Sequence, residues 1–456
     1  MQLKQHYQGI WFLPEYPENK ITGLLNFDPK KGTDLELFGF LSEVHDSNYI
    51  EIIVGITSDG KEITLYKCSR YHLGFNSNGF KTSKYEAQYF LKGSLQTTND
   101  LQFKSIAIQF KDFDKWLNIY GFANYSNRYN NEIQLEYKEP KTLSFDLGNE
   151  IYCDFQFYTI SPILPTNSSI TITQICQIVL YKKGNALPIL ALLELFQSFN
   201  AFLTLAYFAP PLIEEIALYG ECNMELFFRT DVIPDNYNLK TSKSHFLFSF
   251  YEIEPNFQQL LANWFLAEKE ITPTVYGLID TFSKKEKILE LSFLTIAYSI
   301  ETFHRRRRKN NNLPNNEFKE KLNEVLQSVD EKLKPWLVEQ LEYSNEPRLH
   351  DRLVDLIQEL PTNISFLLLK PSEEWYIKHF KWSRNYYTHY SKSLEKKALS
   401  GTALFMLTER SKLLLLCILL MEIGFSPKEL EKIILSKGVI LFNHIVKQEE
   451  VKILKI

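Results

Sequence analysis

The chain has 456 residues, more than one domain usually holds, which predicts two or three globular units of about 100 to 200 residues each. Its composition, 45% hydrophobic and 23% charged, is that of an ordinary folded protein, with Phe and Tyr unusually abundant. The formal net charge of −4 argues against attraction of the whole chain to nucleic acid, so any such contact must be local.

The cysteines and the apolar stretches of the sequence indicate the cellular compartment of the protein. The five cysteines lie far apart with no CxxC pair, which fits a reducing environment and neither a disulfide framework nor a zinc site. Residues 1–20 lack a continuous apolar core, so no signal peptide is predicted. The two most apolar stretches, residues 186–209 and 413–421, are interrupted by polar residues or too short to span a bilayer. We therefore expect a cytoplasmic protein with no membrane contact.

The first part of the chain, residues 1–183, has the pattern of a β-rich domain. Short runs of β-branched and aromatic residues alternate with Gly, Asp, Asn and Ser, which predicts strands. Asp59-Gly60 supplies the positive φ angles of a tight hairpin turn. We expect an antiparallel sandwich or barrel-like region. The strand candidates are residues 34–40, 49–57, 61–68, 102–110, 132–137, 151–158 and 170–181.

The pattern changes after Gly184-Asn185. Residues 188–206 have apolar side chains at helical spacing, which predicts a helix that links two β-rich parts. Strand-like runs return at residues 224–228 and 246–251, and residues 257–269 are again helical. We expect residues 184–269 to form this linking helix and a second β-rich segment.

Helical periodicity dominates the remainder, residues 270–456, and predicts an all-α bundle, so the whole chain is expected to be an α+β multidomain protein. The Asn- and Pro-rich residues 309–316 predict a loop between the first two helices. The helix candidates are residues 284–305, 316–333, 348–359, 373–390, 398–423 and 427–435.

One segment of this bundle, residues 381–389, could carry chemistry. On a helix Asn385 and His389 are neighbours four residues apart, so the amide could orient the imidazole. Arg384 lies about 140° around the axis from His389 on ideal geometry, but its long side chain could reach a shared anion. The same spacing also occurs by chance in helices that have no catalytic role.

Cleavage of RNA by its own 2′-hydroxyl needs a base, an acid and a group that stabilises the phosphorane-like charge. A histidine with a pKa of about 6.5 can take either proton role, and an arginine matches phosphate geometry. One chain supplies a single histidine of this kind, His389, at the motif. Two chains paired symmetrically would supply both acid and base, so this chemistry predicts a homodimer.

These residues carry a resemblance to a known family. Residues 384–389, RNYYTH, resemble the RX4-6H motif of HEPN domains, and residues 288–305 and 404–424 fall where such a bundle has its first and last long helices. Residues 9–27, GIWFLPEYPENKITGLLNF, and 53–68, IVGITSDGKEITLYKC, are similar to the N-terminal domain of ApeA-like proteins. Those are bacterial antiphage proteins that join this domain to a HEPN domain.

The resemblance implies an endoribonuclease that needs neither metal nor cofactor and acts as a HEPN homodimer. Its substrate would be host or phage RNA, with tRNA as one candidate, and its trigger a product of the phage. By the same resemblance Arg384 binds the scissile phosphate, His389 is the acid or base, and Asn385 positions the imidazole. The sequence is consistent with cleavage that needs neither metal nor cofactor, because it contains no HExxH, GxxxxGK[ST], GxGxxG or EF-hand pattern.

Further residues could bind RNA or assist the site. The strongest cationic cluster could hold the RNA backbone, or it could be a solvated helix end, where basic groups offset the helix dipole. Glu301 could approach the active face, with a structural salt bridge as the alternative. Tyr386, Tyr387 and Tyr390 could stack on bases or pack in the bundle. The RNA-binding candidates are His304, Arg305, Arg306, Arg307 and Arg308, followed by Lys309, and then Lys378 and Lys381 beside the motif.

Two other functions remain open from the residues alone. The bundle could serve only for dimerisation, in a non-catalytic RNA-binding or scaffold protein. Residues 1–268 could also bind a carbohydrate or another ligand and control the second part of the chain.

Overall fold

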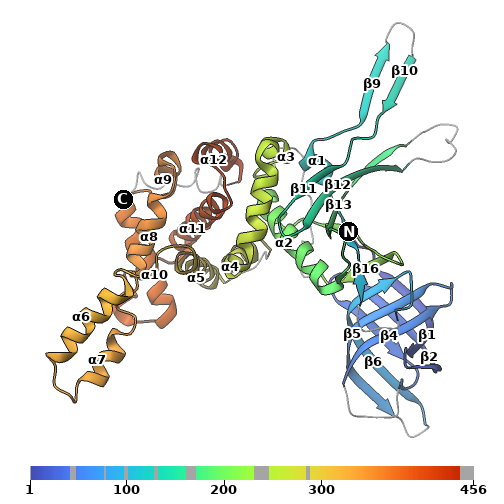
Figure 1. Cartoon of the computed structure of the whole chain (residues 1–456), viewed down its shortest axis with the longest axis horizontal. Coiled ribbons are helices and arrows are strands. Elements are labelled where there is room, and N and C mark those ends of the chain that lie inside the picture. Colours follow the sequence, from blue (N-terminus) through green and yellow to red (C-terminus); the bar gives the residue numbers. More distant parts are fainter. Residues whose placement is uncertain are drawn as a thin grey trace. The chain divides into compact units, whose positions relative to one another are not determined.

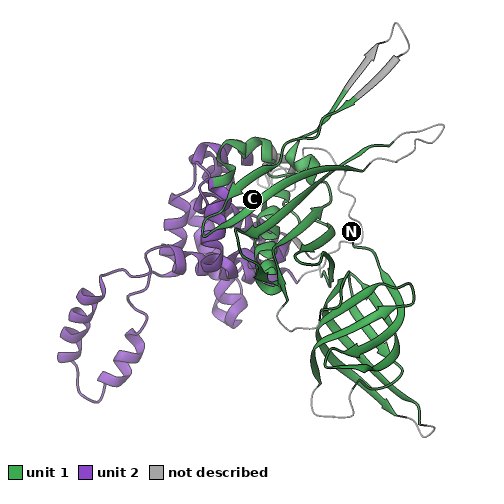
Figure 2. Cartoon of the chain, turned by 45° about the vertical axis from the view of Figure 1, so that its right-hand side comes forward, with its two compact units in different colours: residues 1–258 green, residues 259–456 purple. Residues whose placement is uncertain are grey.

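The computed structural model describes residues 2–41, 48–75, 79–96, 101–127, 132–160, 171–230, 246–283 and 288–441. The chain divides into two compact units, residues 1–258 and 259–456 (Figure 2). The boundary falls inside residues 184–269, so the stretch expected to link two parts contributes mainly to unit 1.

Unit 1 begins with a closed antiparallel β-barrel (Figure 1). In the described part of the chain the strand order is β1-β2-β3-β6-β5-β4, and β4 returns to β1. Closure leaves the barrel without a free edge between its first and last strands. The strands are β1 Gln5–Leu13, β2 Tyr16–Asp28, β3 Gly32–Leu37, β4 Tyr49–Thr57, β5 Glu62–Phe75 and β6 Lys81–Lys92.

The barrel interior is filled by large side chains. Trp11 is fully buried and lies opposite Gly55 on the neighbouring strand. A Cβ atom at residue 55 would lie 2.2 Å from Cε3 of the indole, so only glycine leaves room for this ring. Phe227, from a strand far along the chain, stacks on Phe90 with ring centroids 4.7 Å apart and meets Phe27 edge-on.

A second, open sheet completes the β structure of unit 1. Its order is β16-β15-β8-β13-β12-β11, and it is joined to the barrel because β16 pairs with β6. The strands are β8 Ser105–Phe110, β11 Leu143–Asp146, β12 Ile151–Ile160, β13 Thr173–Lys182, β15 Ile213–Tyr219 and β16 Met224–Phe228. Two further pairs form separate two-stranded sheets: β7 Gln102–Phe103 pairs with β14 Leu187–Pro188, and β9 Phe122–Asn127 pairs with β10 Glu132–Tyr137.

Helices cover one face of the open sheet and enclose an aromatic core. α2, Ile189–Tyr207, packs on β8 and β13. Phe155 of β12 contacts Phe199 of α2 and Phe257. Of the described helices, α2 alone is long and apolar enough to cross a membrane. About two thirds of its apolar stretch is buried within the protein, as in a core helix. The short helix α1, Phe113–Leu117, adds Trp116 to this core.

The prediction of a strand at residues 246–251 is wrong. Residues 246–248 form bends, and residues 250 and 251 already belong to the short helix α3, Phe250–Ile253, which the turn η2, Glu254–Asn256, follows. The carboxylate of Glu252 accepts hydrogen bonds from the backbone N–H and the hydroxyl of Ser249, which starts the helix. The carbonyl of Phe248 accepts a hydrogen bond from Trp116 instead of a strand partner.

Unit 2 is a helical bundle centred on α5 and α11. α5 packs against α11, α10 and α8, and α11 packs against α9 and α12. α4 approaches α5 closely at Gly277, where a Cβ would lie 2.1 Å from the hydroxyl oxygen of Ser299. The helices are α4 Phe257–Ser283, α5 Leu289–Arg307, α6 Asn315–Gln327, α7 Lys334–Leu341, α8 Leu349–Gln358, α9 Thr362–Leu368, α10 Glu373–His389, α11 Gly401–Glu422 and α12 Pro427–Leu441, with the turn η3 Lys392–Leu394.

The expected fold class is confirmed: an antiparallel β-barrel and sheet precede an α-helical bundle. The helices α7 and α9 were not predicted, and the predicted helix 316–333 is shorter, because α6 ends at Gln327. Neither α6 nor α7 has a buried residue.

Candidate active site

The helix α10 presents the candidate catalytic residues. Its N-terminus is capped by the hydroxyl of Ser372, which accepts a hydrogen bond from the Trp375 N–H at 3.1 Å. Its C-terminus is set by Tyr390, whose φ of 49° ends the helix directly after His389. The face that packs into the bundle consists of Tyr376, Ile377, Phe380, Ser383 and Tyr387.

Arg384 is held by two acceptors. Its Nη2 lies 3.0 Å from Oε2 of Glu301 on α5, and its Nη1 donates to Oδ1 of Asn385 at 3.2 Å. The side chain of Arg384 keeps 31% of its surface exposed, whereas Glu301 keeps 16%. Glu301 also accepts a hydrogen bond from Arg305 at 3.3 Å. The guanidinium is therefore fixed on one side and retains exposed donors for an anion.

His389 and Asn385 are arranged differently from the expected pair. His389 is exposed as the last residue of α10 and, within the described ranges, its imidazole makes no hydrogen bond. The oxygen of Asn385 faces Arg384 instead of the imidazole. The structure therefore brings Arg384, Asn385 and Glu301 together and leaves the His389 ring accessible.

Three of the four arginines in the basic run at the end of α5 pair with carboxylates, namely Arg305, Arg307 and Arg308. Arg305 pairs with Glu346 at 2.8 Å, and Arg306 donates to the backbone carbonyl of Glu270 at 2.9 Å. Arg307 pairs with Glu422 at 2.6 Å and also with Glu270. Arg308 pairs with Glu359 at 2.6 Å and with Glu422 at 2.9 Å. These pairs support a structural role for the run, and RNA binding by it stays a prediction from the sequence.

The structure contradicts the expectation that His304 binds RNA, because its side chain is fully buried and an RNA phosphate cannot reach it. Arg352 can only donate, so Nδ1 of His304 accepts from it at 3.0 Å, and Nε2 carries the proton that faces Asp355 at 3.0 Å. Burial lowers the pKa of His304; the Asp355 contact acts in the opposite direction, and the charge of Arg352 adds to the lowering. The imidazole is a neutral structural link between α5 and α8.

The remaining candidates lie around the motif. Lys378 is exposed on α10, and Lys381 is partly exposed one turn before Arg384. Tyr387 is buried and donates a hydrogen bond to the Leu399 carbonyl, which supports a packing role. Tyr390 is 65% exposed.

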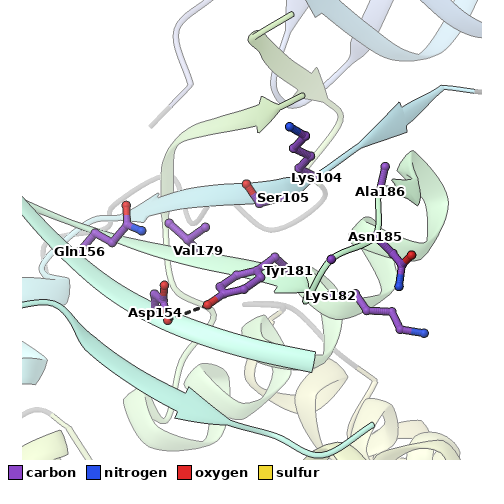
Figure 3. A pocket seen from close by; sticks show the side chains of 10 residues that line it. Lys104, Ser105, Asp154, Gln156, Val179, Tyr181, Lys182, Asn185 and Ala186 are labelled. Atoms are coloured by element: carbon purple, nitrogen blue, oxygen red, sulfur yellow. Dashed lines mark hydrogen bonds between the residues drawn. The ribbon is translucent and has the colours of Figure 1, made fainter. Parts of the chain in front are cut away.

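Unit 1 contains a hollow of about 530 Å³ on the open sheet (Figure 3). The hydroxyl of Tyr181 points at Asp154 with a separation of 3.5 Å, and the carboxylate of Asp154 is buried. The lining residues are Lys104, Ser105, Asp154, Gln156, Val179, Tyr181, Lys182, Gly184, Asn185 and Ala186. No cluster of three or more potential metal ligands occurs among the residues that the structure describes.

Unit 2 is an α-helical bundle whose helix α10 carries the Arg-to-His motif, as expected of a HEPN domain. Residues 294–429 match the family model of the Apea-like HEPN domain. Residues 6–264, more than half of the chain, match the model of ApeA N-terminal domain 1. The chain therefore belongs to the ApeA family, with its N-terminal domain followed by a HEPN domain. Neither a curated protein nor a solved structure gives a significant match.

Proposed function

We propose that this protein is a metal-independent endoribonuclease of antiphage defence that stops infection by cutting RNA in the cytoplasm. Membership of the ApeA family supports the defence role and the HEPN domain supports action on RNA. The observation that carries the proposal is the arrangement at the end of α10, where an exposed His389 follows a guanidinium that is already oriented.

In the proposed reaction the ribose 2′-oxygen attacks phosphorus, the bond to the 5′-oxygen breaks, and a 2′,3′-cyclic phosphate forms. One imidazole removes the 2′ proton and a second protonates the 5′-oxygen, a pair of roles worth roughly a hundred- to ten-thousand-fold each. The exposed donors of Arg384 stabilise the charge on the phosphoryl oxygens. Because each chain has one motif histidine, the active form is a homodimer of HEPN domains.

Unit 1 has the proposed role of sensing the phage-derived trigger or restraining the nuclease. Its support is the hollow lined in part by Asp154 and Tyr181, whose side chains offer hydrogen-bonding groups to a ligand. The substrate to test first is tRNA.

The test compares wild type with His389→Ala and Arg384→Ala during phage challenge, following growth and the ends of total RNA. His350→Ala is the matched control, since His350 is also an exposed histidine of unit 2 and lies outside α10. We expect new RNA ends and protection in wild type and in the control only. Equal behaviour of all four proteins would favour the alternative, a non-catalytic RNA-binding or dimerising scaffold.

A further inference from the structure

The outward face of α10 carries a row of aromatic side chains that leads to His389. Trp375, Trp382 and His389 are seven residues apart, close to two helical turns, so they share one side of the helix. The buried residues of α10, such as Phe380, lie on the opposite side. Along the axis Trp382 is about 10 Å and Trp375 about 21 Å from His389, at about 1.5 Å per residue.

Cationic groups flank the second tryptophan of this row. Nζ of Lys378 lies 4.9 Å from the ring centroid of Trp382, and Nζ of Lys397, which follows η3, lies 5.6 Å from it. The ring of His379 is tilted by 31° against that of Trp375, with centroids 4.2 Å apart, and meets Trp382 edge-on at 5.3 Å. We call Trp375, Lys378, Trp382 and Lys397 the α10 ridge.

The charge around the ridge differs from that of the whole chain. Residues 370–400 contain seven lysines and arginines and three glutamates, a net charge of +4 with His neutral, within a chain of net charge −4. Two of the glutamates lie in the first turn of α10, at the end away from His389. Among the residues that the structure covers, neither Lys378 nor Lys397 pairs with a carboxylate, in contrast to Arg307 and Arg308.

We propose that the α10 ridge binds unpaired nucleotides of the RNA next to the bond cut at His389. An aromatic ring stacks on any base, and alanine substitution of such a ring typically weakens binding five- to about a hundredfold per base. The lysines beside the ring bind the phosphates and release their counterions. Bases inside a duplex are already stacked, so this surface selects single-stranded RNA. The inference rests on the proposed function, because the ridge is placed relative to the catalytic histidine.

A second copy of the chain is a less suitable occupant of the ridge. A symmetric helix pair would bring the lysines of both ridges together without carboxylates to neutralise them, and like charges at an interface are unfavourable. A polyanion has the complementary charge.

The test uses the full chain with His389→Ala, which binds RNA without cutting it. Fluorescence anisotropy measures its affinity for a labelled single-stranded oligoribonucleotide and for a hairpin duplex of the same composition. Adding Trp382→Ala should weaken single-strand binding about tenfold, and Trp382→Phe should restore most of it. Adding Lys378→Ala and Lys397→Ala should reduce the slope of log affinity against log salt by about 1.4, at about 0.7 per phosphate contact.

Matched controls lie in the α6 and α7 region of the same unit. Trp336 is 58% exposed on α7, so Trp336→Ala removes an exposed indole without touching the ridge. Lys319→Ala with Lys321→Ala on α6 removes two exposed ammonium groups. Affinity and salt dependence should be unchanged in both controls.

Three outcomes would overturn the proposal. They are unchanged single-strand affinity in Trp382→Ala, equal affinity for duplex and single strand, and dissociation of the dimer by Trp382→Ala with RNA affinity intact, which would make the ridge an interface between copies. The binding assay is independent of cleavage. A protein that binds through the ridge but never cuts RNA would refute the nuclease and leave the binding surface standing.

Discussion

The guanidinium of Arg384 and the carboxylate of Glu301 face each other at 3.0 Å from two different helices, α10 and α5. Arg384 precedes the exposed His389 by five residues on α10, and the pair restricts the rotamers of an otherwise long and mobile side chain. Asn385 accepts a second hydrogen bond from the same guanidinium. The guanidinium of Arg384 is therefore held in one orientation, which is the preorganisation that its proposed role in stabilising a phosphate would require.

We predict that Glu301→Gln lowers RNA cleavage about tenfold to a hundredfold, because a guanidinium displaced by about 1 Å loses that much rate. The thermal unfolding temperature should change little. Cleavage is measured on a labelled oligoribonucleotide with unfolding followed by circular dichroism. Glu346→Gln is the control, because it removes ion pairs with Arg305 and Arg352 but does not touch Arg384. Faster cleavage by Glu301→Gln would mean that the pair restrains the enzyme instead.

The basic run on α5 should stabilise unit 2 without binding RNA. Arg308→Ala removes the partner of Glu359 and one of the two arginine partners of the nearly buried Glu422, so we expect a loss of about 1–3 kcal/mol of stability. Urea unfolding measures this loss, and anisotropy should show unchanged RNA affinity. Lys309→Ala, at the end of the same run, serves as the control for stability. A large fall in RNA affinity with unchanged stability would restore the original RNA-binding expectation for this run.

Acid should destabilise unit 2 through His304. Burial holds its folded pKa below the ordinary value of about 6.5, so between those two values the unfolded chain binds more protons than the folded one. Its contribution is therefore present above about pH 6.5 and is lost as the pH falls below that value. Replacing it by Gln should reduce the slope of unfolding free energy against pH by up to about 1.4 kcal/mol per pH unit.

The slope is measured by urea unfolding at several pH values from about 7.5 to 5.5. His350→Ala removes an exposed histidine from α8 and should leave the slope unchanged. An identical slope in wild type and His304→Gln would contradict the neutral, buried state.

Gly55→Ala should destabilise the barrel, because the added methyl group overlaps the Trp11 ring and must push it from its place. Overpacking of this kind costs about 1–3 kcal/mol or more. Gly220→Ala is the control, since its Cβ would make only ordinary contacts, 3.4 Å or longer. Equal melting temperatures for the two variants would show that the indole can move aside easily.

The local patterns of the sequence were sufficient for much of the fold. The run at residues 49–57 coincides with β4, and residues 373–390 contain α10 with one residue of difference at its end. Barrel closure could not be predicted, because it depends on which strands pair, and β1 pairs with β4 across a long stretch of chain. Residues 246–251 alternate like a strand, but the capping of α3 and the aromatic core outweigh that preference.

The site was predictable only in part. The spacing of Arg384 and His389 identified the helix and its motif, whereas the partners of the basic side chains come from other helices. Glu270, Glu359 and Glu422 lie on or next to α4, α8 and α11, so their pairing with α5 depends on packing that no local pattern records. The ridge residue Lys397 was missed for the same reason, although the lysine-rich stretch after the motif was a visible signal.

Phe227 in the barrel interior has a consequence for protein synthesis. The first six strands emerge from the ribosome more than a hundred residues before β16, yet their core lacks one of its stacked rings until that strand arrives and pairs with β6. The core of the nascent barrel therefore remains incompletely packed while the open sheet and α2 are being synthesised. A chain that ended after residue 183 would lack Phe227, so its barrel core would stay incompletely packed. We therefore expect the barrel and the open sheet of unit 1 to complete their folding together during translation.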